Sequence, residues 1–166
     1  MNQRTRSILR YLFVVLLGVI LHFAYELSGE NLIVGLFSPV NESVWEHLKL
    51  LFFPMLLLTL WDLFTNYRSN PAFLPARTTG ILAGMSFIAV LYYTITGIVG
   101  TPVDWINILI YFLSVAYVFW VERKICQRNQ YLNTTISIAI LIVLIILFIV
   151  FTLVPPALGI FVPPTA

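Results

Sequence analysis

Residues 136–150 read ISIAILIVLIILFIV, a run with one hydroxyl group and no charge. Extended to residues 132–154, the run is long enough to cross a bilayer, which takes about 20 largely apolar residues. Backbone groups in lipid must be satisfied within a helix or a closed barrel, so we expect each such run to be a helix. The sequence predicts an all-α membrane protein with five transmembrane helices. The expected spans are residues 7–25, 44–64, 78–99, 105–121 and 132–154.

The composition agrees with a protein that lies mostly in the lipid bilayer. Of the 166 residues, 60% are hydrophobic and 10% are charged, whereas soluble domains carry about 25% charged residues. We therefore expect a single polytopic domain over residues 1–166. The formal net charge of +2 gives no indication of a nucleic-acid partner, and the single cysteine excludes an internal disulfide.

The basic residues predict the orientation of the chain. Eight of the nine fall in segments that meet on one side of the membrane if the chain crosses it five times, and Lys49 is the exception. Positive residues favour the cytoplasmic side, so the N-terminus is predicted in the cytoplasm and the C-terminus outside. The eight residues are Arg4, Arg6, Arg10, Arg68, Arg77, Arg123, Lys124 and Arg128.

Both histidines and four of the seven acids lie between His22 and His47. Charge near a bilayer is costly, so such a cluster indicates a functional site. His22 and Glu26 are four residues apart, as are Glu42 and Glu46, and this spacing puts each pair on one face of a helix. Imidazole and carboxylate groups together suit zinc or another divalent metal. We predict His22, Glu26 and His47 as metal ligands, and Glu42 or Glu46 as a general base.

Structural interpretations of the same residues remain open. Ser43 and Glu46 have the spacing of a capping box at the start of the second span. Glu46 and Lys49 are three apart and would pair on one helix face. His22 would also be satisfied by a hydrogen bond to Tyr25 or to a carbonyl group.

The segment between the first two spans, residues 31–37, reads NLIVGLF. It is too short to cross the bilayer and too apolar for a solvated loop. We expect an interfacial or re-entrant segment, which would serve either as a simple anchor or as a lid over a cavity.

A polar stripe follows the predicted fourth span. Asp104, Asn107 and Tyr111 are separated by three and four residues, which keeps them on one helical face. Such a stripe normally faces the bundle interior or a water-filled cavity, and we predict a cavity that opens to the external side and is lined by spans one to four. Hydrogen bonding between helices is the alternative. Together with this stripe, Asn41 and Trp45 are candidate ligand contacts.

Three features concern packing between helices. Gly80 and Gly84 form a GxxxG pattern, which permits close helix contact and suggests a homo-oligomer through this face. Pro54 is expected to kink the second span. The acids near the cytoplasmic ends, Asp62 and Glu122, are expected to pair with nearby basic residues. These partners would be Arg68 and Arg123.

Residues 35–50, GLFSPVNESVWEHLKL, resemble a family of small bacterial integral membrane proteins known only as a domain of unknown function. The distinctive part is Ser-Pro-Val-Asn-Glu-Ser-x-Trp-Glu-His-Leu-Lys at residues 38–49. Residues 22–26, HFAYE, and the proline-rich end of the fifth span also resemble this family, so the similarity covers most of the chain. The resemblance implies a multi-pass protein of the cytoplasmic membrane and supplies no activity.

Three classes of function fit these observations. The first is an externally open site that binds a metal ion or a small polar ligand and that would support hydrolysis at the outer leaflet, because a metal-bound water is a nucleophile. The second is a transporter or sensor coupled to a cation or a proton. The third is a scaffold or partner subunit without catalysis.

Overall fold

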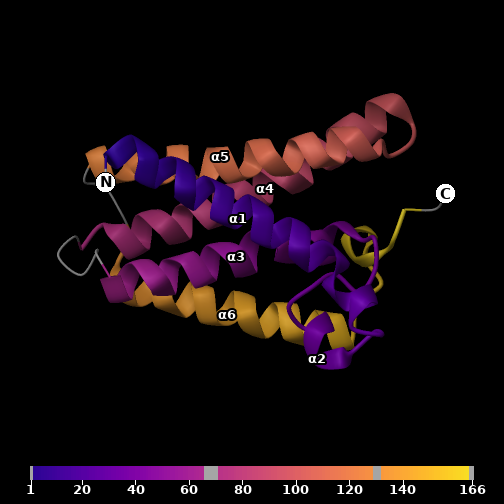
Figure 1. Ribbon diagram of the computed structural model, residues 1–166. Helices are drawn as coiled ribbons and strands as arrows, with labels where there is room; N and C mark the ends of the chain where they lie inside the picture. The colour runs from indigo at the N-terminus through magenta and orange to yellow at the C-terminus, as the bar shows by residue number, and fades with distance from the viewer. Residues whose placement is uncertain (1, 66–70, 129–131, 165–166) are drawn as a thin grey trace.

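The computed structural model describes residues 2–65, 71–128 and 132–164, and these ranges contain helices and no strand (Figure 1). Five of the helices are long and apolar enough to cross a membrane, as predicted. The elements are α1 (Gln3–Leu27), α2 (Leu32–Gly35), α3 (Val44–Thr65), α4 (Phe73–Val99), α5 (Asp104–Arg128), α6 (Thr134–Leu153) and the short 3₁₀ helix η1 (Gly159–Phe161).

The long helices run alternately up and down. The N-terminus, the end of α3 and the start of α4 lie at one end of the bundle, and α2 and the C-terminal segment lie at the other (Figure 1). Helix α3 is central, since 13 of its 22 residues are buried. It packs against α1 and α4, and α4 forms a hairpin with α5. The tip of that hairpin stands away from α1 and α3 (Figure 1).

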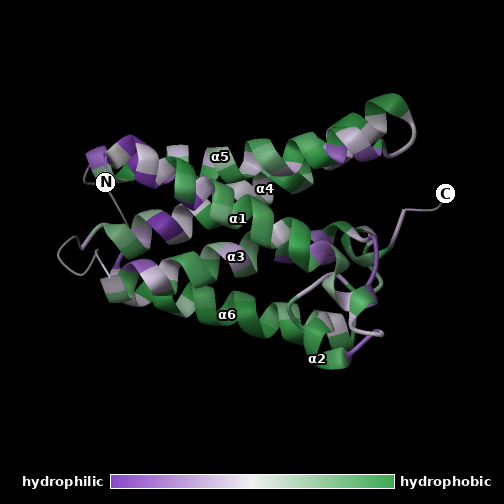
Figure 2. Ribbon diagram, in the orientation of Figure 1, coloured by the Kyte–Doolittle hydropathy of each residue, from purple (hydrophilic) through white to green (hydrophobic). Residues whose placement is uncertain are grey.

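Apolar side chains cover the outside of the bundle between its two ends. Figure 2 shows hydrophobic residues along the middle of the helices and hydrophilic residues gathered toward the ends. Ile20 on α1 is 63% exposed and Ile146 on α6 is 52% exposed, although both are aliphatic. An exterior of this kind suits lipid, and the chain is a multi-pass membrane protein by the character of its five long helices.

Two helices extend well beyond their predicted spans. Helix α4 begins at Phe73 rather than at residue 78, and α5 continues to Arg128 rather than ending at residue 121. As a result Arg77, which the sequence placed in a connecting loop, lies inside α4 and is fully buried. Hydropathy marks where a helix enters lipid, whereas the backbone hydrogen bonds of the helix continue past that point.

Arg77 binds two acids and thereby connects three helices. Its Nε donates to Glu122 Oε2 on α5 at 2.7 Å, and its Nη2 donates to Asp62 Oδ2 on α3 at 3.1 Å. Asp62 Oδ1 accepts a further bond from Arg10 Nη2 on α1 at 2.6 Å. Two guanidinium groups and two carboxylates balance in charge, which a buried ionic network requires. The expected pairing of both acids is confirmed, and their partners among the described residues are Arg10 and Arg77. The predicted partners were Arg68, which lies outside the described residues, and Arg123.

One tyrosine hydroxyl links three helices where α3 contains a proline. Pro54 has no N–H group, so the carbonyl of Leu50 loses its helical donor. The Tyr111 hydroxyl of α5 lies 3.3 Å from the Leu50 oxygen and 3.1 Å from the Val14 oxygen of α1. Gly18 of α1 leaves room for this hydroxyl, because a Cβ there would overlap it. Tyr111 thus bonds backbone carbonyls, which agrees with the interhelical alternative for the polar stripe.

Gly80 and Gly84 bring α4 and α5 together within one chain. A Cβ at Gly80 would approach the Val118 carbonyl oxygen to 2.9 Å, and one at Gly84 would overlap the Val118 side chain. Both glycines are buried by this contact. Packing within one chain therefore accounts for the GxxxG pattern, and a homo-oligomer through these two residues stays a prediction.

Replacing Gly18 with alanine tests the crossing at Tyr111. We expect Gly18→Ala to destabilise the protein by about 1–3 kcal/mol, because the added methyl group displaces the tyrosine hydroxyl in a packed contact. Gly97→Ala is the matched control, since Gly97 lies in α4 with open space around it, and alanine gains up to about 1 kcal/mol in a helix. Thermal unfolding in detergent should therefore show a lower midpoint for the first variant only. Equal midpoints for the two variants would contradict the account.

Candidate metal centre

The connection between α1 and α3 turns sharply directly after α1. Gly29 and Glu30 have positive φ values of 70° and 61°, which the left-handed turn requires. The Ser28 hydroxyl donates to the Tyr25 carbonyl at 2.7 Å, and the Asn31 side chain caps α2 by accepting from the Ile33 amide at 2.9 Å. The chain therefore folds back along the end of α1 and returns to the start of α3.

Helix α3 starts with half of the predicted capping box. Ser43 Oγ accepts from the Glu46 amide at 3.4 Å, as predicted. The Ser43 amide does not bond to Glu46 but donates to Asn41 Oδ1 at 2.9 Å. Asn41 thus makes a turn before the helix, and the Glu46 carboxylate is left for other donors.

Glu46 and Lys49 hold the connection against α3. Lys49 Nζ donates to Glu46 Oε2 at 2.6 Å, and also to the carbonyls of Gly35 at 2.8 Å and Ser38 at 3.2 Å. Glu46 Oε2 in turn accepts from the Val40 amide at 3.0 Å. Both charged side chains are buried. We call the Glu46–Lys49 pair, with the main-chain groups that it binds, the clamp.

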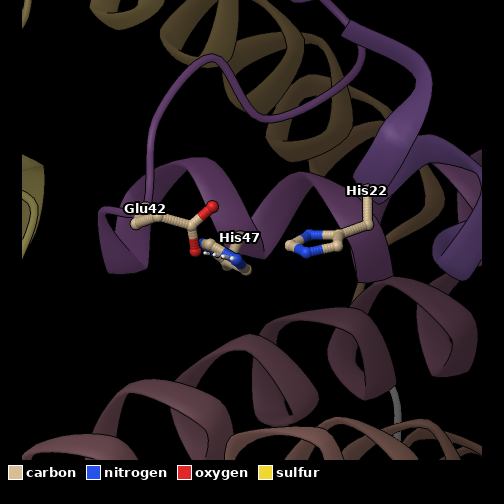
Figure 3. Close-up of side chains that lie close together, drawn as sticks. All are labelled: His22, Glu42 and His47. Atoms are coloured by element: carbon tan, nitrogen blue, oxygen red, sulfur yellow. Dashed lines mark ion pairs between the residues drawn. The ribbon is translucent and has the colours of Figure 1, made fainter. Parts of the chain in front are cut away.

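The clamp places Glu42 beside His47. His47 Nε2 lies 3.3 Å from Glu42 Oε2 (Figure 3). His47 Nδ1 lies 3.0 Å from the Ser43 carbonyl oxygen. A carbonyl only accepts hydrogen bonds, so Nδ1 carries a proton. Nε2 is directed at the carboxylate, to which it donates when the ring is doubly protonated and towards which it presents a lone pair when the ring is neutral. An Nδ1–H group bonded to a backbone carbonyl is the arrangement that orients metal-ligating histidines.

His22 completes a group of three potential ligands. It comes from α1, and its ring centre lies 5.2 Å from that of His47. One donor atom from each of His22, Glu42 and His47 lies within 4.8 Å of the other two. His22 Nδ1 is buried, and no hydrogen-bond partner is found for it among the described residues. A buried polar nitrogen without a partner is costly and calls for an explanation.

The charges in this group favour an ionised carboxylate. The hydrogen bond from His47 lowers the pKa of Glu42 below its ordinary value, and partial burial opposes this only in part. The Glu42 side chain is 69% exposed and that of His47 is 28% exposed. The group therefore lies at the surface of the protein, with its carboxylate accessible to solvent.

Two of the predicted site acids do not belong to this group. Glu26, predicted as a ligand one turn after His22, is exposed, and its carboxylate is not part of the group formed by His22, Glu42 and His47. Glu46, predicted as a general base, is 2% exposed and is occupied by the clamp. Its contacts agree instead with the structural alternative of a pair with Lys49.

The other predicted ligand contacts serve packing or lie apart. Trp45 packs on the rings of Phe148 and Phe161 with ring centres 4.8 and 5.0 Å away, which joins α3 to α6 and to η1. Asp104 is exposed at the start of α5, at the tip of the hairpin that stands away from α1 and α3 (Figure 1). Asn107 is half-buried one turn further along. The cavity lined by the first four spans stays a prediction.

The comparison with known proteins gives a family and no activity. The family described as "Family of unknown function (DUF6512)" matches residues 2–165. The chain belongs to this family. No curated protein and no solved structure is similar to the chain. The match confirms the expectation of a family of unknown function over nearly the whole chain. What this chain does has to be argued from its residues.

Removing the lysine of the clamp tests its role. Lys49→Met leaves the Glu46 carboxylate buried without its cation, and we expect a loss of about 3–5 kcal/mol in the free energy of unfolding. Adding Glu46→Gln removes the uncompensated charge, so the double variant should recover part of that loss. Arg128→Met, at an exposed position, should stay within about 0.5 kcal/mol of wild type. Chemical denaturation in detergent measures all four proteins, and a double variant no more stable than the single one would contradict the clamp.

Proposed function

We propose that this chain is a protein of the cytoplasmic membrane that binds a zinc ion on its external side through His22, Glu42 and His47. The observation that carries the proposal is the convergence of these three donor groups within 4.8 Å. The unpartnered, buried Nδ1 of His22 supports it, because a metal bound at this nitrogen would supply the missing partner.

The distances suit a tetrahedral ion after a small adjustment. Bonds of about 2.0–2.2 Å place two ligand atoms of a tetrahedral zinc about 3.4 Å apart. His47 Nε2 and Glu42 Oε2 are already separated by 3.3 Å. The His22 nitrogen lies at most 4.8 Å from the other two ligand atoms, so a tetrahedral ion requires it to approach them by at most about 1.4 Å.

The number of donors favours a reactive centre over a structural one. Structural zinc sites are closed by four protein ligands, whereas catalytic sites use three and keep a position for water. Two histidines and one carboxylate are such a set, and the exposed Glu42 leaves the fourth position accessible to solvent. A zinc-bound water loses its proton near neutral pH and becomes a nucleophile. Hydrolysis of a substrate at the outer face of the membrane is the reaction class that this arrangement supports.

The proposed orientation rests on the charges at the two ends of the bundle. Arg4 and Arg6 lie at the start of α1, and Lys124 and Arg128 lie at the end of α5, which is the same end of the bundle. Positive residues favour the cytoplasmic side of a membrane. The opposite end, which carries His22 and His47, then faces outside.

Elemental analysis of the purified protein tests the proposal. The protein is prepared in mild detergent with a tag free of histidine, without chelator, and then equilibrated with zinc. We expect roughly one zinc ion per chain for wild type, as for other folded zinc sites. His22→Ala, Glu42→Ala and His47→Ala each remove one ligand and should weaken retention by more than about tenfold.

Glu26→Ala is the matched control. Glu26 is an exposed acid one turn from His22 and lies outside the group of three, so this variant should keep its zinc. Two histidines and a carboxylate also bind iron(II), so the same samples are analysed for iron. Bound iron would identify a different ion at the same three ligands. The proposal fails if folded wild type retains neither metal, or if Glu26→Ala loses as much zinc as the three ligand variants.

A further inference from the structure

Side chains of helices α4 and α5 line a shallow, open apolar groove on the outside of the bundle. Its volume is about 430 Å³, and almost all of its lining is apolar. Phe87 and Tyr117 stack with ring centres 4.9 Å apart, and Tyr117 and Trp120 stack with centres 5.6 Å apart and planes at 17°. These three rings stack in sequence and form the aromatic wall of the groove. Leu113 and Ala116 complete the lining.

The groove ends at exposed positive charge. Lys124 Nζ lies 5.8 Å from the centre of the Trp120 ring, and Arg123 beside it on α5 is also exposed. From Leu113, which lines the groove, to Lys124 the helix rises about 16 Å. The groove therefore runs from the apolar middle of α5 to a pair of cations at the end of the bundle that carries the N-terminus (Figure 1).

We propose that this groove binds an anionic phospholipid. One acyl chain lies along the wall of Phe87, Tyr117 and Trp120, and the headgroup phosphate is bound by Lys124 and Arg123. Basic residues next to an apolar surface between transmembrane helices recognise acidic headgroups in this way. Tryptophan at the level of the headgroups contributes an apolar face with a polar edge.

Charge complementarity favours this lipid over a second copy of the chain. A second copy with the same orientation in the membrane would bring its own Lys124 and Arg123 to the same end of the groove. Like charges at close range repel, whereas a phosphate group neutralises them. The inference uses none of the three residues of the proposed metal site and is independent of that function.

Fluorescence quenching by brominated lipids tests the inference. The protein is reconstituted into phosphatidylcholine vesicles in which a fixed share of the lipid is brominated on its acyl chains. In one set of vesicles the brominated lipid is phosphatidylglycerol, and in the other set it is phosphatidylcholine. Bromine quenches tryptophan on contact, so Trp120 reports occupancy of the groove. Trp120→Phe identifies the part of the signal that comes from this residue.

We expect phosphatidylglycerol to quench Trp120 in preference to phosphatidylcholine. Lys124→Gln should lower the ratio of the two binding constants about fivefold, which corresponds to about 1 kcal/mol for one basic residue at a membrane surface. Arg128→Gln is the control, because it removes an exposed cation one turn beyond Lys124 and should leave the ratio unchanged.

Three results would overturn the inference. The first is equal quenching of Trp120 by the two lipids in wild type. The second is an equal decrease of the ratio of the two binding constants in Arg128→Gln and Lys124→Gln, because the preference would then arise from the general surface potential. The third is a stable dimer in light scattering that Trp120→Ala dissociates, since a second copy would then occupy the groove.

Discussion

The buried ion pair between Glu46 and Lys49 determines the course of the chain between α1 and α3. Two charges in an apolar environment attract each other far more strongly than in water, so the pair fixes both side chains in one geometry. The remaining donors and acceptors of the pair then bind the main chain of residues 35–40. Glu42 follows this segment directly and comes to lie against His47. The path of the connection and the geometry of the candidate metal centre thus depend on the same contact.

The two polar ends of the bundle differ in how their charged and metal-ligating groups are paired. At the end with the N-terminus, Arg77 and its two acids form a charge-balanced network that stabilises helix packing. At the other end, His22 keeps a buried nitrogen for which the described residues offer no partner. Networks that are fully paired are explained by structure alone, whereas an unsatisfied group beside a carboxylate and an imidazole points to a ligand. Thr78 Oγ1 beside Arg77 and Trp45 Nε1 also have no partner among the described residues, but only His22 lies with two further metal-ligating groups within 4.8 Å.

Sequence reasoning predicted the number of spans because hydropathy over about 20 residues depends on composition alone. It missed the burial of Arg77, whose acid partner Glu122 is 45 residues away in the chain and becomes visible only after the helices pack. At the site, the two histidines were predicted as ligands, but helical spacing favoured Glu26 over Glu42. Glu42 precedes α3, so its position is set by the turn at Asn41 and by the clamp, and no helical periodicity describes it. A proline four residues after Leu50 was the available signal that a donor such as Tyr111 would be needed there.

X-ray absorption spectroscopy of the zinc-loaded wild-type protein in detergent tests the central claim most directly, because it reports the atoms bound to the metal. The account predicts a first shell of two imidazole nitrogens with carboxylate and water oxygens at about 2.0–2.2 Å. Sulfur scattering at about 2.3 Å would identify Cys126 as the ligand instead. A shell without imidazole would likewise contradict a centre formed by His22, Glu42 and His47.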